Sequence, residues 1–305
     1  MSRQLRSVIM LLITAIVWGF AFIAQRVGTD NLGPYTFTFS RSLIASGFLL
    51  LIFFVFKKTS PAYRNEVYDL KKTIKYAVLC GTFLTIGLNL QQIGIMGTSA
   101  GKAGFLTATY IVLIPILGFF VGKKVSKQVI FCVFLVIVGT YLLSVKEDLS
   151  INRSDMIILI AAVIFAIHII LLSTCPDDCE KILVNVIQFF MVFFISLILA
   201  FFKEKILIKE ILAAYLPILY VGVLSSGVGF TLQIIALKDI DPTIGSLVTS
   251  LESVFAAIFG LIFLNQTMNF REISGCIIIF LATIFAQIPR GFIREKILKK
   301  RSVYK

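Results

Sequence analysis

The chain has 305 residues, of which 58% are hydrophobic and only 15% are charged, and its mean hydropathy is +0.98. A soluble domain carries about a quarter charged residues, so this composition excludes an ordinary soluble protein. The formal net charge of +13 would suit a nucleic-acid-binding protein. However, the lysines and arginines lie at the ends of apolar segments, as membrane topology requires, and we expect no nucleic-acid partner.

Apolar segments of about 20 residues recur along the chain, each long enough to cross roughly 30 Å of hydrocarbon as a helix. They are continuous rather than alternating, which favours helices over the strands of a barrel. The first could pass for a signal peptide, but the similar segments that follow indicate a retained first span. Ten spans are predicted: residues 7–25, 34–56, the two arms of a hairpin within 87–122, 128–145, 156–174, 182–202, 211–237, 243–264 and 273–288.

The hairpin at residues 87–122 is repeated later in the chain. At an offset of 142 residues, eight of the 36 paired positions are identical, including the pairs Gln91/Gln233 and Thr107/Thr249. Glutamine and threonine are scarce inside apolar segments, so these matches indicate an internal duplication. Each copy has five spans, an odd number, so the second copy must enter the membrane in the opposite orientation.

The sequence therefore predicts an all-α polytopic membrane protein with ten transmembrane helices arranged as two inverted five-helix repeats. We expect the first repeat over residues 1–145, a polar linker over 146–155, the second repeat over 156–290 and a basic tail over 291–305. With the N-terminus inside, 20 lysines and arginines fall on inside segments and 8 on outside segments. This bias predicts that both termini are cytoplasmic and that the protein lies in the plasma (inner) membrane, although the bias is absent in the second half.

Several side chains inside the predicted spans are candidates for substrate binding: Trp18, Asn89, Gln92, Tyr110, His168, Gln233 and Glu252. Amides and carboxyls are costly in lipid unless they face a cavity or another helix. Asn89 and Gln92 are three residues apart and share one side of a helix. Trp18 suits a cavity wall or an interfacial anchor.

Two of these residues are candidates for proton coupling. Glu252 lies in the interior of a span, where it would carry a proton or contact a cation, or else hold helices together as a hydrogen-bonded acid. His168, the only histidine, is the second candidate, with an interhelical hydrogen bond as the alternative. For Arg41 we expect pairing with an acid or snorkelling rather than contact with a substrate.

Several motifs follow one another along the chain: Trp18-Gly-Phe-Ala-Phe, Pro34 before the second span, Arg41 within it, residues 104–115 and residues 251–257. Together they resemble the EamA-like family of the drug/metabolite transporter superfamily. The resemblance extends from about residue 11 to residue 288 and implies a ten-span carrier, usually an exporter of amino acids or other metabolites. The family often has Gly-Glu at the ends of spans four and nine, where this chain has Lys123-Lys124 and Asn265-Gln266.

The main hypothesis is a secondary active transporter of amino acids or related small metabolites that works by alternating access. A lipophilic-cation or drug exporter is the first alternative, and a lipid-scrambling or structural membrane protein is the second. No phosphate-binding loop or H-E-x-x-H motif occurs, and we expect neither enzyme activity nor a cofactor. Expected partners are a small-molecule substrate and membrane lipid. Cys175 and Cys179 lack a second ligand pair, so no metal site is expected there.

Overall fold

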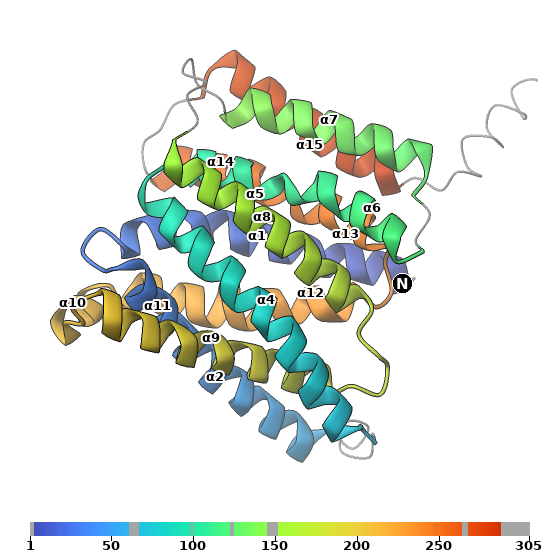
Figure 1. The fold of residues 1–305 in the computed structure, drawn as a ribbon. Helices are drawn as coiled ribbons and strands as arrows, with labels where there is room; N and C mark the ends of the chain where they lie inside the picture. Colours follow the sequence, from blue (N-terminus) through green and yellow to red (C-terminus); the bar gives the residue numbers. More distant parts are fainter. Residues whose placement is uncertain are drawn as a thin grey trace, which may run out of the picture.

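The computed structural model describes residues 3–60, 67–98, 100–122, 125–144, 152–263 and 268–287. These residues form helices and their connections, with no strand among them. The helices run roughly along one another in a single bundle (Figure 1). Most of the predicted linker, the basic tail, Lys123-Lys124 and Asn265-Gln266 lie outside the described residues.

The described helices are, in chain order, α1 (Arg3–Gly28), α2 (Pro34–Thr59), α4 (Leu70–Met96), α5 (Ala100–Ala108), α6 (Tyr110–Phe120), α7 (Lys127–Ser144), α8 (Arg153–Ser173), α9 (Lys181–Lys203), α10 (Ile208–Ala213), α11 (Tyr215–Tyr220), the π-helix η1 (Val221–Gly229), α12 (Phe230–Ala236), α13 (Pro242–Thr249), α14 (Leu251–Phe263) and α15 (Phe270–Gln287). Alone or joined end to end, they give eight segments long and apolar enough to cross a membrane. The chain is therefore a helical, multi-pass membrane protein.

The other two of the ten predicted spans correspond to α7 and α15. The apolar part of α7, Lys127–Leu142, is shorter than any of the eight long segments. The two helices lie side by side along one edge of the bundle (Figure 1). A Cβ atom on Gly139 would lie 2.8 Å from the Gly275 carbonyl oxygen, so the helices meet at a position that only glycine fills.

The remaining helices form contacts that cross between the two halves of the chain. From the first half, α2 packs along α9, and α4 packs against both α8 and α9. Helix α1 crosses α13 and α14 on one side and the α11–η1–α12 segment on the other. Because most large contacts join the halves, neither half forms a separate core in the described structure.

The two predicted hairpins turn where the sequence indicates. Helix α4 ends at Met96, is followed by Gly97, and gives way to α5 at Ala100. In the second hairpin the Asp241 side chain caps α13 by accepting hydrogen bonds from the following backbone amides, and Pro242 occupies the first turn.

Each of the fourth and ninth spans is interrupted by one residue. Thr109 separates α5 from α6, and Ser250 separates α13 from α14. The Thr109 hydroxyl donates to the Leu106 carbonyl at 2.6 Å, and the Ser250 hydroxyl donates to the Leu247 carbonyl at 2.7 Å. A hydroxyl that bonds back to a carbonyl of the preceding turn competes with the helix ladder and loosens it. Both spans are therefore interrupted near their centres.

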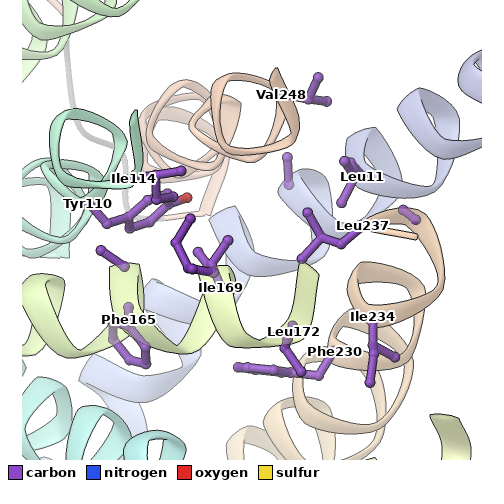
Figure 2. Close-up of a cluster of buried hydrophobic side chains, with 14 of the residues drawn as sticks. Leu11, Tyr110, Ile114, Phe165, Ile169, Leu172, Phe230, Ile234, Leu237 and Val248 are labelled. Atoms are coloured by element: carbon purple, nitrogen blue, oxygen red, sulfur yellow. The ribbon is translucent and has the colours of Figure 1, made fainter. Parts of the chain in front are cut away.

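An apolar cluster fills the bundle where α1, α8, α12 and α13 meet. Leu11, Leu172, Ile234, Leu237 and Val248 are buried there, on the helices that Figure 2 draws around the cluster. Beyond this cluster the connection between α8 and α9 is held by ion pairs. These join Asp178 to Lys72 at 2.7 Å and Asp177 to Lys238 at 2.8 Å, and the Lys238 ammonium lowers the pKa of the Asp177 carboxyl. This end of the bundle is closed by packing.

Candidate functional site

A cavity lies inside the bundle, between helices of both halves. Its volume is about 50 Å³, which is room for a few water molecules, and it is partly open to the surroundings. Its wall is formed by Trp18, Ala21, Phe22, Gln25, Arg41, Leu88, Gln91, Thr107, Tyr110, Phe165, His168, Ile169, Ser225, Phe230, Gln233 and Glu252. Most of the cavity surface is apolar, although about half of these residues bring a polar group to it.

The structure brings together five of the seven predicted site residues. Trp18, Tyr110, His168, Gln233 and Glu252 all line the cavity, and they come from five different helices. The repeated glutamines, Gln91 and Gln233, both face the cavity.

Asn89 and Gln92 are not among the residues that line the cavity, contrary to expectation. Asn89 is turned toward α9, where its amide and the Ser196 hydroxyl exchange hydrogen bonds at 2.9 and 3.0 Å. Gln92 is completely buried. Successive helix residues point about 100° apart, so the shared side of Asn89 and Gln92 faces other helices while Gln91 faces the cavity. Gln91 donates to the Thr107 hydroxyl at 3.2 Å.

Tyr110 and Glu252 meet on the cavity wall where α6 and α14 begin. The Tyr110 hydroxyl lies 3.0 Å from the Thr249 hydroxyl and donates to Glu252 Oε1 at 3.4 Å. Glu252 is only 2% exposed, and no salt bridge to it occurs among the described residues. A buried carboxylate without a counter-ion is unfavourable, so a negative charge at this position is costly unless an oppositely charged partner approaches it.

His168 begins a chain of hydrogen bonds across three helices. Its Nε2 lies 2.7 Å from the Gln188 side-chain oxygen, and the Gln188 amide donates to Asn185 at 2.9 Å. Asn185 in turn donates to the Thr231 hydroxyl at 3.3 Å. Because the Gln188 nitrogen is already donating, its oxygen faces the ring and His168 donates from Nε2. The sequence analysis did not single out Gln188 or Asn185, although both are amides within an apolar helix.

Trp18 is held against an unusual helix. Its indole N–H donates to the backbone oxygen of Ser225 at 3.1 Å, within the π-helix η1. A π-helix displaces carbonyls from the regular ladder and is often found at functional sites. The Trp18 ring also contacts Phe230, with ring centroids 4.9 Å apart. Trp18 is therefore a cavity wall rather than an interfacial anchor.

Arg41 corrects a second expectation, because its side chain neither snorkels nor pairs with an acid. It is 2% exposed and lines the cavity. Its Nη1 donates to the Gln25 side-chain oxygen at 3.2 Å, and no salt bridge involves it among the described residues. Helix α2 is covered by η1 and α9, so a side chain that begins at this position has no route to the membrane interface.

In the described part of the chain, no group of three or more histidine, cysteine, aspartate or glutamate residues could hold a metal ion. All five cysteines, including Cys175 and Cys179, are free thiols in the structure.

One short pattern was overlooked in the sequence analysis. Residues 97–101 read Gly-Thr-Ser-Ala-Gly, which fits the G-x-S-x-G pattern of serine hydrolases. That motif acts at a sharp turn from a strand to a helix. Here the segment joins α4 to α5, so the context that the motif needs is missing, and Ser99 itself lies outside the described residues.

The chain is similar to known transporters over most of its length. The model described as the EamA-like transporter family matches residues 5–145 and again residues 152–287. The chain is 28% identical to an uncharacterized transporter of Archaeoglobus fulgidus, over 91% of this chain and 84% of that protein. It is 22% identical to the uncharacterized transporter YoaV of Bacillus subtilis, over 87% of this chain and 90% of that protein.

A solved crystal structure has the same fold. It superposes with a TM-score of 0.73 at 13% sequence identity and covers 92% of this chain and 96% of its own. At this identity the likeness concerns the fold alone.

Proposed function

Since this chain belongs to the EamA-like transporter family, we propose that it is a secondary active exporter of amino acids or related small metabolites. The observation that carries the proposal is the cavity in which Tyr110 of one half and Glu252 of the other meet. A mostly apolar cavity with converging polar groups suits a small amphiphilic solute. Alternating access would expose this site to each side of the membrane in turn.

The proposed architecture is two inverted five-helix repeats, with α7 and α15 as the fifth and tenth spans. In this arrangement α1 corresponds to α8, and α4 corresponds to the α11–η1–α12 segment. The helix contacts support it, because the contact of α4 with α8 has a counterpart in the contact of the α11–η1–α12 segment with α1. Exchanging the halves also maps α1–α14 onto α8–α6 and leaves α2–α9 and α7–α15 unchanged. Tyr110 and Glu252 are 142 residues apart, the offset of the repeat, as expected for equivalent residues near a twofold axis. The double family match also supports a division into residues 1–145 and 156–290.

We further propose that both termini are cytoplasmic and that the protein lies in the plasma membrane. The support is the 20-to-8 distribution of lysine and arginine along the chain. In that orientation the end closed by Leu11, Leu172 and Leu237 faces the cytoplasm.

Proton coupling is proposed to occur at Glu252. Its carboxyl would hold a proton in one state and a substrate ammonium group in the other, so that a proton enters as a substrate leaves. Tyr110 donates to the carboxylate and would stabilise it during the exchange. His168 is the second candidate, because it lines the same cavity.

The test is uptake into proteoliposomes of a panel of amino acids and lipophilic cations, with and without a pH gradient. We expect pH-driven accumulation of at least one amino acid and no dependence on ATP. Accumulation of lipophilic cations alone would favour the drug-exporter alternative, with Glu252 as the counter-charge. Lipid scrambling without solute transport would favour the non-transport alternative.

The variant Glu252→Gln tests the coupling step. Glutamine keeps the shape and hydrogen bonding of the residue but cannot titrate, so we expect normal insertion and loss of pH-driven accumulation by more than about tenfold. Glu210→Gln is the matched control, because Glu210 lies on α10 and does not line the cavity. Retained accumulation in Glu252→Gln would leave Glu252 as a structural residue and make His168 the next to test.

A further inference from the structure

One charged group in the cavity is left with unused hydrogen-bond donors. Arg41 is almost fully buried, yet its Nε and Nη2 have no partner among the described residues. A buried guanidinium without a counter-ion is costly. Because this one lines a cavity with two unpartnered nitrogens, a ligand in the cavity could supply the missing hydrogen bonds and the counter-charge.

The geometry of the guanidinium identifies which edge is free. Nη1 is occupied by Gln25, whose own amide nitrogen donates to the Ala21 carbonyl at 3.1 Å and so fixes the orientation of the glutamine. Nε and Nη2 carry the parallel N–H groups on the other edge, which is the edge that binds a carboxylate side-on through two hydrogen bonds. Gln25 therefore positions Arg41 with its carboxylate-binding edge unoccupied.

We propose that Arg41 is the subsite for the carboxylate of the transported solute, positioned by Gln25. The inference rests on the proposed function and narrows it, because a solute held at Arg41 must carry an anionic group. A carboxylate is favoured over a phosphate, since Glu252 lines the same cavity and would repel a dianion. A zwitterion with its carboxylate at Arg41 and its ammonium facing Glu252 would give each of these two buried side chains a partner of opposite charge.

The chain contains a built-in reporter for a binding test. Trp18 is the only tryptophan, and it lines the same cavity as Arg41. Fluorescence of the purified full-length protein, excited at the red edge of tryptophan absorption, therefore reports ligands that enter the cavity. The probes are L-phenylalanine, L-phenylalaninamide, which lacks the carboxylate, and phenyl phosphate.

We expect L-phenylalanine to bind at least about 30-fold more tightly than its amide, as for other buried charged hydrogen-bond pairs. In Arg41→Gln this ratio should fall below about threefold while the amide still binds as before, which shows that the cavity is intact. Arg41→Lys should also lose most of the preference for L-phenylalanine over its amide, because a lysine ammonium cannot form two parallel hydrogen bonds to a carboxylate. The control is Arg26→Gln on α1, an exposed arginine paired with Asp30, which should keep the ratio.

Three results would overturn the assignment. The acid and the amide could bind equally, the affinity ratio between them could persist in Arg41→Gln, or the fluorescence response to every carboxylate could be independent of Arg41. Tighter, Arg41-dependent binding of phenyl phosphate would replace the carboxylate with a phosphate and also refute it. Uptake measured in parallel separates this proposal from the proposed function. Equal transport of L-phenylalanine and its amide would refute the carboxylate subsite but leave the proposed transport function standing. Arg41-dependent binding without any transport would support the subsite but refute the proposed transport function.

Discussion

Two sets of buried polar side chains in this bundle have different energetic consequences. His168, Gln188 and Asn185 satisfy one another across α8 and α9. Arg41 and Gln233, in contrast, line the cavity with atoms that have no hydrogen-bond partner. The first group can stabilise the fold without a ligand, while the second gains hydrogen bonds only when something occupies the cavity.

This distinction predicts the effect of Gln188→Leu. The change leaves both His168 and Asn185 without their partner, and we expect it to lower the free energy of unfolding by about 0.5–2 kcal/mol. Reversible unfolding in mixed detergent measures the difference. Thr82→Ala is the control, because Thr82 is exposed and bonds only to the Val78 carbonyl of its own helix. Equal stability of the two variants would show that the network contributes nothing to the fold.

At the level of the helices, the π-helix η1 determines the position of Trp18. Its sequence, Val-Gly-Val-Leu-Ser-Ser-Gly-Val-Gly, is rich in residues with weak helix propensity, which makes a departure from the α-helical ladder less costly. The backbone oxygen of Ser225 is then reachable by the Trp18 indole. A Cβ atom on Gly229 would lie 2.6 Å from Trp18 Nε1, so the ring packs where only a glycine leaves room.

Gly229→Ala should therefore displace the Trp18 ring and break its bond to Ser225. We expect a shift in the tryptophan emission maximum and a loss of stability of about 1–3 kcal/mol, as in other overpacked sites. Gly47→Ala on α2 is the matched control, because nothing lies within 4 Å of its added Cβ. That change should be neutral or stabilise by up to about 1 kcal/mol, since alanine favours a helix. An unchanged emission spectrum in Gly229→Ala would contradict the assigned contact.

For the whole molecule, the two ends of the bundle differ. The wall of the cavity includes Gln25, near the end of α1, and Arg41, near the beginning of α2. At the other end Leu11 and Leu237 are buried, and the ion pairs of Asp177 and Asp178 hold the loop above them. These exposed pairs are individually weak, at about 0–1 kcal/mol each, so they can open without a large barrier. Such a closure would suit the proposed alternating access, in which this end must open once in each cycle.

The proposed orientation predicts the accessibility of introduced cysteines. In a variant without the five native cysteines, a cysteine added after Lys305 should not react with a membrane-impermeant thiol reagent on intact cells. Lys205→Cys, in the exposed connection after α9, should react readily because this connection is proposed to be extracellular. Permeabilising the cells should make the added C-terminal cysteine reactive. The reverse pattern on intact cells would invert the topology.

Much of the candidate site could be predicted from the sequence because polar residues in apolar segments are costly and therefore few. Glu252, His168 and Gln233 stand out in the sequence for this reason, and all three reach the cavity. Which of the neighbouring residues Gln91 and Gln92 faces the cavity could not be predicted in the same way. Adjacent residues differ by about 100° around a helix, and which direction is inward depends on the helices that surround α4.

The sequence by itself determined the membrane location, the helical architecture and the two related hairpins, because these follow from hydropathy, segment length and local breaks. Tertiary structure alone decided the pairing of Tyr110 with Glu252, the amide chain from His168 and the unused edge of Arg41. These contacts join residues 142, 20 and 16 positions apart, in helices whose relative rotation and depth are fixed by packing. No local pattern encodes that rotation, so the partner of each polar group emerges only when the bundle is assembled.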